Sequence, residues 1–466
     1  MTVQSHIDKN SGSFRDPSGY IFRHNNEIYR YIAPNYLPHY RMLMDSGLYQ
    51  KLVDEGLLIS HQEKPNMPAI DGGLIIKPTM IPFISYPYEW CFSQIKDAAL
   101  TTLKIQKIAL EHNMVLKDAN AYNIQFFQGK PILIDTLSFE KYEENAPWVA
   151  YQQFCQHFLV PLCLATYTDV FLPRLTSMFC DGIPLEIAVK LLPTRAHFNL
   201  GLQMHLFAHV KFQKNYNEKP KDAKSFKIKK SGLLALIFDL ERVVNKLHFP
   251  SRHTEWGDYY TNTNYTSKAI LEKENMVAKL IDKLDIKTVW DVGSNDGRFS
   301  RMATDKGLFT ISSDIDPVAV EKNYLQTKVK NEKLMLPLIV DLNNPSPNIG
   351  WNNQEREAFF GRAKSDLILA LALIHHIAIS NNVPFDQVAS FFAPLCRYLM
   401  IEFVPKDDSK VQRLLASRKD VFVHYNQPDF EKSFSQYFNI KEKILIKGTK
   451  RTLYLMETKT RVPHNE

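Results

Sequence analysis

The sequence lacks the features that mark membrane-spanning and disulfide-stabilised proteins. None of its apolar runs is long enough to cross a bilayer, and the stretch from Met1 to Arg15 is too polar for a secretory signal. Its five cysteines are odd in number and include no Cys-x-x-Cys pair, so they imply no zinc site. They predict reduced, mostly buried thiols in a cytoplasmic protein: Cys91, Cys155, Cys163, Cys180 and Cys396.

Acidic residues are scarce in one short tract, which accounts for most of the net charge of +7. Residues 211–231 contain eight lysines and only two acidic residues. This composition predicts a solvated, Lys-rich linker, and the near-neutral remainder disfavours nucleic acid as a partner. A chain of 466 residues with 45% apolar content can bury two cores. We therefore expect one domain over residues 1–210 and a second over residues 232–466.

The segment Thr288–Ser300 combines a buried strand, a turn of small residues and the start of a helix. Doubly wound α/β sheets build ligand sites from this succession. Gly293 and Gly297 allow the backbone to pass close to a ligand, and Asp291 places a carboxylate at the carboxyl end of the strand. The glycine spacing alone is weakly specific, because a dinucleotide site begins in a similar way.

The elements that follow sharpen this interpretation. Residues 308–316 predict a second strand that ends on Asp314 and Asp316, and residues 336–342 predict a third strand that ends near Asp341. Acidic residues at the ends of successive parallel strands lie along one edge of a sheet, where a ribose diol can be bound.

Two further strands carry candidate proton acceptors. Residues 365–374 are apolar enough for a strand covered on both faces and are followed by His375 and His376. Residues 397–404 predict a fifth strand that contains Glu402. One histidine, or Glu402, is a candidate base for a bound substrate. The alternatives are a solvated histidine loop and a carboxylate that accepts a hydrogen bond from a nearby backbone amide.

The pattern resembles the class I S-adenosylmethionine-dependent methyltransferases over residues 256–459. The resemblance implies an α/β fold with a Rossmann-like seven-stranded sheet whose last strand is inserted antiparallel, consistent with two late strands at 440–447 and 451–459. It implies that the methionine part of the cofactor lies against the first turn, that the second-strand acid binds ribose and that the third-strand acid contacts adenine. The corresponding residues are Asp291, Gly293 and Gly297, then Asp314 with Asp316 as the alternative, then Asp341.

The first half carries a second motif, in which Asp118, Asn123 and Asp135 flank a predicted hairpin. This spacing resembles the catalytic loop and metal-binding strand of protein-kinase-like folds, where the first Asp orients a hydroxyl and the others hold magnesium. Three departures favour a degenerate, non-catalytic α+β kinase-like domain. No Gly-rich loop is present, Arg30 stands where a lysine is expected, and Thr136 follows the second acid. A plain hairpin with turn acids is the alternative.

The pairing of the two halves resembles a group of bacterial nodulation-type or host-specificity methyltransferases. The distinctive matches are FISYPYEW at 83–90, IDTLSF at 134–139 and IEFVPK at 401–406. The resemblance implies an enzyme that transfers a methyl group from S-adenosylmethionine to a small-molecule or glycan acceptor, without a metal. One alternative is a bifunctional kinase and methyltransferase that also uses ATP and magnesium, and the other is a non-catalytic binding scaffold.

Overall fold

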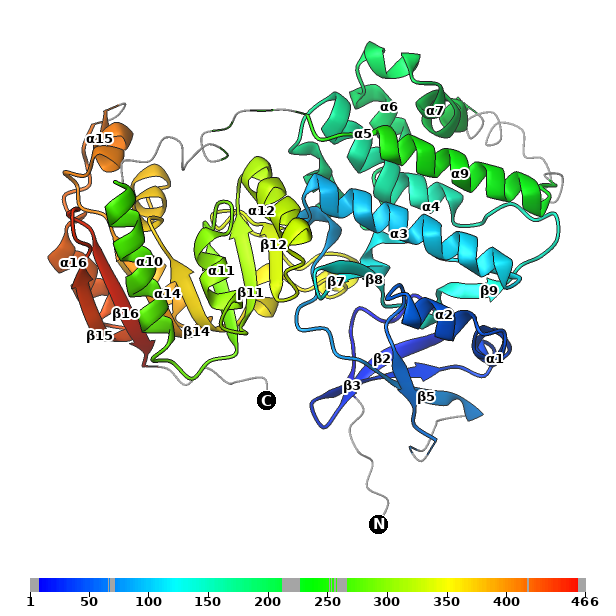
Figure 1. Ribbon diagram of the computed structural model, residues 1–466, viewed down its shortest axis with the longest axis horizontal. Coiled ribbons are helices and arrows are strands. Elements are labelled where there is room, and N and C mark those ends of the chain that lie inside the picture. The colour runs from blue at the N-terminus through cyan, green and yellow to red at the C-terminus, as the bar shows by residue number, and fades with distance from the viewer. Residues whose placement is uncertain are drawn as a thin grey trace. The chain divides into compact units, whose positions relative to one another are not determined.

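The structure is a computed structural model that describes residues 8–65, 67, 72–211, 227–250, 252, 254, 257, 266–416 and 419–459. The chain forms two compact units (Figure 1). Unit 1 comprises residues 1–251 and 348–357, and unit 2 comprises residues 252–347 and 358–466. Most of the predicted Lys-rich linker, residues 212–226, lies outside the described residues.

Unit 2 is built on a seven-stranded sheet in the order β12-β11-β10-β13-β14-β16-β15. The strands are β10 Thr288–Val292, β11 Phe309–Asp314, β12 Met335–Ile339, β13 Ser365–Ala370, β14 Cys396–Phe403, β15 Phe438–Leu445 and β16 Thr452–Thr458. Strands β10 to β14 run parallel, and β16 lies antiparallel between β14 and β15. The predicted α/β organisation is confirmed.

Helices cover both faces of this sheet, because successive side chains of its buried strands point to opposite faces. The helices are α10 Ser267–Ile281, α11 Arg298–Thr304, α12 Pro317–Lys330, α13 Phe359–Arg362, α14 Phe385–Phe392, α15 Ser409–Leu415 and α16 Gln427–Phe434, with a π-helical turn η12 at His376–Ser380. Val289 packs in one core cluster with Val277 of α10 and Phe299 of α11. The next residue, Trp290, packs against Phe359 of α13, with ring centroids 5.4 Å apart.

Unit 1 combines a five-stranded antiparallel sheet with a mainly helical part (Figure 1). The sheet has the order β1-β2-β3-β5-β4, and two further two-stranded sheets pair β6 with β9 and β7 with β8. The strands are β1 Asp8–Lys9, β2 Gly19–His24, β3 Glu27–Ile32, β4 His61–Glu63, β5 Leu74–Pro78, β6 Met114–Leu116, β7 Ile124–Phe127, β8 Lys130–Leu133 and β9 Phe139–Lys141. The β2–β3 turn places Asn25 and Asn26 at φ of 50° and 61°, a conformation that asparagine tolerates in tight hairpins.

The helical part of unit 1 is organised around α3. The α-helices are α1 Leu37–Asp45, α2 Leu48–Asp54, α3 Phe92–Glu111, α4 Tyr151–Phe154, α5 Val160–Tyr167, α6 Leu185–Leu191, α7 Leu200–Leu202 and α9 Lys230–Lys246. Shorter 3-10 and π-helical turns are η2 Pro87–Glu89, η3 Ala121–Asn123, η4 Thr136–Ser138, η5 Cys155–Leu159, η6 Leu172–Ser177, η7 Thr194–Phe198 and η8 Gln203–Ala208. The Gln94 side chain accepts from the Cys91 amide and stabilises the start of α3.

Helix α9 belongs to unit 1, whereas the sequence led us to place it at the start of the second domain. Its buried stripe includes Leu233, Ile237 and Leu240, and Glu241 forms an ion pair of 2.7 Å with Lys107 of α3. The chain therefore passes from unit 1 to unit 2 after residue 251. An amphipathic stripe indicates that one face of a helix is buried, but it does not identify the element that covers this face.

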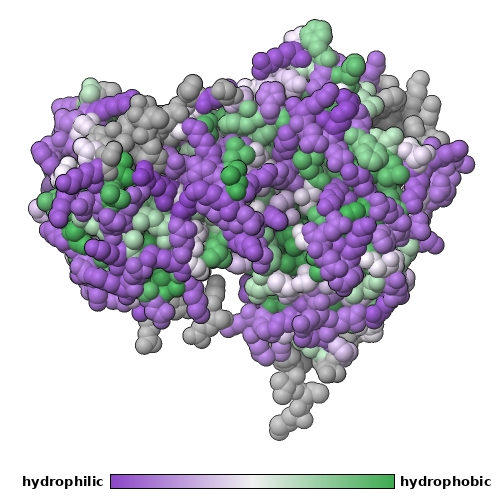
Figure 2. Space-filling model, viewed as in Figure 1, coloured by the Kyte–Doolittle hydropathy of each residue, from purple (hydrophilic) through white to green (hydrophobic). Residues whose placement is uncertain are grey.

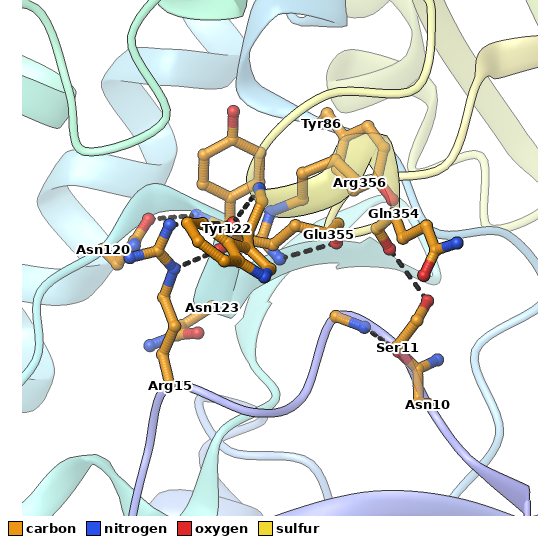
Figure 3. Close-up of polar contacts among 12 residues, drawn as sticks. Asn10, Ser11, Arg15, Tyr86, Asn120, Tyr122, Asn123, Gln354, Glu355 and Arg356 are labelled. Atoms are coloured by element: carbon orange, nitrogen blue, oxygen red, sulfur yellow. Dashed lines mark hydrogen bonds and ion pairs between the residues drawn. The ribbon is translucent and has the colours of Figure 1, made fainter.

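A second departure concerns residues 348–357, which lie in the sequence between β12 and β13 but belong to unit 1. The Ser11 hydroxyl donates to the Gln354 carbonyl over 2.8 Å, and Arg15 forms an ion pair of 2.5 Å with Glu355. Figure 3 shows these contacts beside Tyr122, over whose ring the Arg356 guanidinium lies at 4.4 Å from the centroid. Unit 1 is thus completed by a segment from far along the chain.

The visible surface is mainly hydrophilic, with small scattered hydrophobic areas (Figure 2). Isolated exposed hydrophobic side chains, such as Val329, are normal on protein surfaces. Among the described residues, no helix is both long and apolar enough to cross a membrane.

Candidate functional site

Unit 2 contains a cavity of about 420 Å³ at the carboxyl ends of β10, β11, β12 and β13. Ligands of open α/β sheets bind at this edge. Residues on its wall include carboxylates, one lysine, one histidine and apolar side chains: Ile270, Lys273, Asp291, Gly293, Asn295, Phe299, Asp314, Asp341, Leu371, Leu373, His376 and Leu414. The sequence-predicted candidates divide into those on this wall and those elsewhere.

The first turn places Asp291 and Gly293 on the cavity wall. Asp291 is buried and accepts a hydrogen bond of 2.6 Å from the Ser300 hydroxyl. Burial raises the pKa of Asp291 to about 7, because a desolvated carboxylate is costly to ionise. Gly293 adopts a φ of +70° and donates its amide to the Ser313 carbonyl over 2.8 Å. This left-handed turn brings bare backbone to the cavity.

Gly297, which the sequence predicts to lie against the cofactor, is not among the residues that line the cavity. It precedes α11 at a φ of +81°, and a Cβ atom placed there would approach the Asn323 side chain to 2.5 Å. Its lack of a side chain therefore serves the packing of α11 against α12.

Asp314 and Asp316 both follow the second strand, and the structure separates them. Asp314 lines the cavity and accepts hydrogen bonds of 2.9 Å from the amides of Asn295 and Asp316. Burial raises its pKa to about 6. The Asp316 side chain accepts from the Val318 amide over 2.8 Å and caps α12, so its carboxylate already has a structural role outside the cavity wall.

Asp341 also lines the cavity. Strand β12 ends at Ile339, three residues earlier than the range 336–342 predicts, so Asp341 lies in the loop that follows. Its carboxylate accepts from the amide of Asn343 over 2.9 Å. The structure thus brings Asp291, Asp314 and Asp341 to one cavity from three neighbouring strands.

The two histidines differ in exposure to the cavity. His376 lines it, whereas His375 is buried and does not. Burial lowers the pKa of His376 to about 4 and lowers the pKa of His375 well below its ordinary value. Both rings are consequently neutral near pH 7, and only His376 can meet a bound substrate.

Glu402, the third candidate base, is fully buried and does not line the cavity. Its carboxylate forms ion pairs with Lys273 at 2.5 Å and with Arg451 at 3.3 Å, and Arg451 pairs in turn with Asp408 at 2.7 Å. A carboxylate held between two cations is stabilised in its charged form and is poorly suited to accept a proton from a substrate.

Two features of the wall were missed in the sequence. Lys273 of α10 is buried on the side of the helix that also carries Ile270 and Val277. A lysine within an apolar stripe is the sequence feature that could have indicated its place on the wall. The predicted strand 365–374 ends at Ala370, and Ala372 lines the cavity at a φ of +53°. Such strain at a non-glycine residue is common at ligand sites.

Unit 1 brings its three predicted residues into one hydrogen-bonded cluster. The Asn123 amide donates to Asp118 over 3.0 Å and contacts the Ser138 hydroxyl at 3.4 Å, and that hydroxyl donates to Asp135 over 2.8 Å. Arg30 of β3 completes the cluster with an ion pair of 2.5 Å to Asp135. Burial, reinforced by the charge of Asp135, raises the pKa of Asp118. Across the described residues, no group of three or more His, Cys, Asp or Glu side chains is arranged to hold a metal.

The fold and cavity define unit 2 as a doubly wound α/β domain with a ligand site at the carboxyl ends of its strands. The whole chain belongs to the family of nodulation protein NoeA of Rhizobium meliloti (strain 1021). It is 35% identical to that protein over 457 residues, which cover 96% of this chain and 95% of NoeA. The predicted resemblance to nodulation-type bacterial proteins is therefore confirmed. No family model matches the chain.

Comparison with solved structures gives only weak likenesses. The bifunctional kinase-methyltransferase WbdD is 15% identical, with a TM-score of 0.30 over 44% of this chain and 42% of that chain. The N-methyltransferase NodS of Bradyrhizobium japonicum WM9 is 11% identical, with a TM-score of 0.31 over 41% of this chain and 97% of that chain. Likenesses with scores this low show nothing about function.

Proposed function

We propose that this protein is an S-adenosylmethionine-dependent methyltransferase whose cofactor binds in the cavity of unit 2. The observation that carries the proposal is the convergence of Asp291, Asp314 and Asp341 on one cavity from three adjacent strands. This arrangement suits a nucleoside with a cationic tail, because each carboxylate can accept hydrogen bonds from the ligand or offset its charge.

The residues present fit the cofactor. A volume of about 420 Å³ lies within the usual range for small-molecule pockets, roughly 300 to 1,000 Å³. Asp314 is proposed to bind the ribose diol and Asp341 the adenine, while Asp291 and Gly293 face the methionine part. The buried carboxylates have raised pKa values, and a positively charged ligand favours their ionised forms. When bound, the cofactor supplies an electrophilic methyl group.

The protein then has to orient the acceptor, exclude water and take up a proton. We favour His376 as the proton acceptor, because it lines the cavity and carries an imidazole nitrogen that can accept a proton. Burial lowers its pKa to about 4, which makes it a weak base. His375 and Glu402 are less suitable, since neither lines the cavity. The family resemblance favours a small-molecule or glycan acceptor, and the five free cysteines agree with a cytoplasmic location.

For unit 1 we propose a kinase-like domain without phosphotransfer activity that assists acceptor binding or docking. Asp135, which would hold magnesium in an active kinase-like site, is paired with Arg30 at 2.5 Å. The guanidinium thus already neutralises the carboxylate that a metal would need. A bifunctional enzyme that uses ATP and magnesium is the second candidate, because Asp118, Asn123 and Asp135 remain in one cluster.

Calorimetric titration of S-adenosylmethionine into the full-length protein tests the proposal. We expect micromolar binding that is lost in Asp314→Ala and kept in Asp316→Ala. The second variant is a matched control, because the same chemical change two residues away removes a helix cap outside the cavity wall. Thermal unfolding of each variant checks the fold.

Titration of ATP with magnesium runs in parallel. Absence of S-adenosylmethionine binding by the wild type would overturn the methyltransferase proposal. If only ATP with magnesium bound, unit 1 would become the active domain. If neither ligand bound, the protein would act as a scaffold.

A further inference from the structure

The cavity wall contains a buried lysine, Lys273, whose side chain is only 5% exposed. It projects from α10, outside the strand-end motifs that suggested the site. The Lys273 ammonium lies 2.5 Å from Glu402 and 4.7 Å from the centre of the Phe299 ring. Both neighbours hold the ammonium group in a fixed place beside the cavity.

A buried ion pair is a costly way to fill a core, because apolar side chains of similar size are often equally stabilising. Burial lowers the pKa of Lys273, while the charge of Glu402 opposes that shift. Arg451 lies on the other side of Glu402 and is itself paired with Asp408. This chain of charges begins at the cavity and leads away from it, which is the arrangement expected of a supported ligand contact.

The order of the strands indicates which part of a ligand meets Lys273. Strands β12, β11 and β10 are neighbours in that order, and they bring Asp341, Asp314 and Asp291 to the wall in the same order. If Asp341 contacts adenine and Asp314 contacts ribose, the amino-acid end of the cofactor lies at Asp291. The charge of Asp291 also acts on Lys273. A carboxylate and an ammonium near each other match the two charges of an amino-acid zwitterion.

We propose that Lys273 binds the carboxylate of the cofactor's amino-acid end and that Glu402 is the positioning residue that holds the lysine for this task. The inference rests on the proposed function and extends it from the kind of cofactor to the recognition of one group on it. Lys273 thereby distinguishes the complete cofactor from adenosyl compounds that lack the carboxylate.

The test combines a change in the ligand with a change in the protein, measured by calorimetry. The ligands are S-adenosylmethionine and its decarboxylated form, which keeps the sulfonium and the amine. We expect the wild type to bind the decarboxylated ligand about 10- to 100-fold more weakly, the size typical of a charge-assisted hydrogen bond. Lys273→Met should bind both ligands with similar affinity, because the contact that distinguishes them is gone.

Three further variants separate binding from structure. Lys273→Arg keeps the cation and should restore part of the preference for the carboxylate. Glu402→Gln should reduce the preference without abolishing it, since it loosens the lysine. Lys279→Met alters an exposed lysine of the same helix and should leave both affinities unchanged.

Each outcome decides between the proposals. Equal binding of both ligands by the wild type overturns the role of Lys273, whatever the variants do, and leaves the methyltransferase proposal standing. An unchanged preference in Lys273→Met, or in Lys273→Gln if the first variant does not fold, also overturns it. Failure of the wild type to bind either ligand counts against the proposed function itself.

Discussion

The acidic clusters of the two units contain the same kind of residue in opposite settings. In unit 2, Asp291 and Asp314 are buried beside a cavity, and burial raises the pKa of each carboxyl. In unit 1, Asp135 is paired with Arg30 and hydrogen-bonded to Ser138. The two clusters therefore differ in what faces the carboxylates, which is a cavity in unit 2 and a directly paired arginine in unit 1.

The largest expected effect comes from removing the internal cation of unit 1. Arg30→Met leaves Asp135 without its partner, and both side chains are mostly buried. We expect the free energy of unfolding of unit 1 to fall by about 3 kcal/mol or more, the usual cost of breaking a buried ion pair. Urea denaturation followed by tryptophan fluorescence measures the change.

Arg41→Met is the matched control, because the Arg41–Glu63 pair is largely exposed and should contribute less than about 1 kcal/mol. A similar small loss in Arg30→Met would show that the acidic cluster of unit 1 does not depend on its cation. Magnesium-dependent ATP binding that appeared only in this variant would show instead that Arg30 keeps an otherwise competent site inactive.

The second effect concerns pH and belongs to unit 2. The carboxyls of Asp291 and Asp314 have pKa values of about 7 and 6 in the free protein. A ligand with a sulfonium and an ammonium group favours the ionised carboxylates, so binding releases protons. Affinity for S-adenosylmethionine should rise as pH increases from about 5 to 7 and level off above, by up to about tenfold per pH unit for each proton released.

Calorimetry in buffers of different ionisation enthalpy counts the released protons. In the absence of ligand, the same two carboxyls affect the stability of the fold, and they lower it as pH rises. Their folded-state pKa values exceed those of the unfolded chain, so the stability they contribute is complete below about pH 4 and is lost as pH rises through 6 and 7. Ligand affinity that stays flat over this range would show that the two carboxyls do not face the cofactor.

The smallest expected effect concerns Gly297 and tests whether its lack of a side chain serves the packing of α11 against α12. Gly297→Ala and Gly307→Ala both place a side chain at a φ of +81°, but only the first meets a neighbour, at Asn323. Each should lose about 1 kcal/mol to backbone strain, and Gly297→Ala should lose about 1 kcal/mol more. The difference in midpoint temperature, measured by calorimetric unfolding, tests this assignment. Equal losses would mean that Asn323 moves aside without cost.

The sequence was sufficient to predict those parts of the fold that depend on local patterns. The apolar run before Asp291 and the small residues after it define β10 and its turn. These features depend on residues close together in the chain, so the pattern alone contains the information.

The remainder depends on contacts between distant residues. The sequence favours Asp314 over Asp316, but the cap that gives Asp316 a separate role in α12 is visible only in the structure. Glu402 is an ion-pair partner of Lys273 and Arg451, which lie far from it in the sequence. Spacing within a strand cannot reveal a partner on a separate helix. The assignment of α9 to unit 1 was missed for the same reason.

The segment 348–357 has a consequence for the order in which the protein is made. Unit 1 includes this segment, and Glu355, Gln354 and Arg356 supply contacts to its early residues and to Tyr122. During synthesis, unit 1 therefore cannot complete its native contacts until the ribosome has passed residue 357, by which time β10, β11 and β12 have been made. A gene fragment that stops at residue 251 encodes unit 1 without one of its own parts.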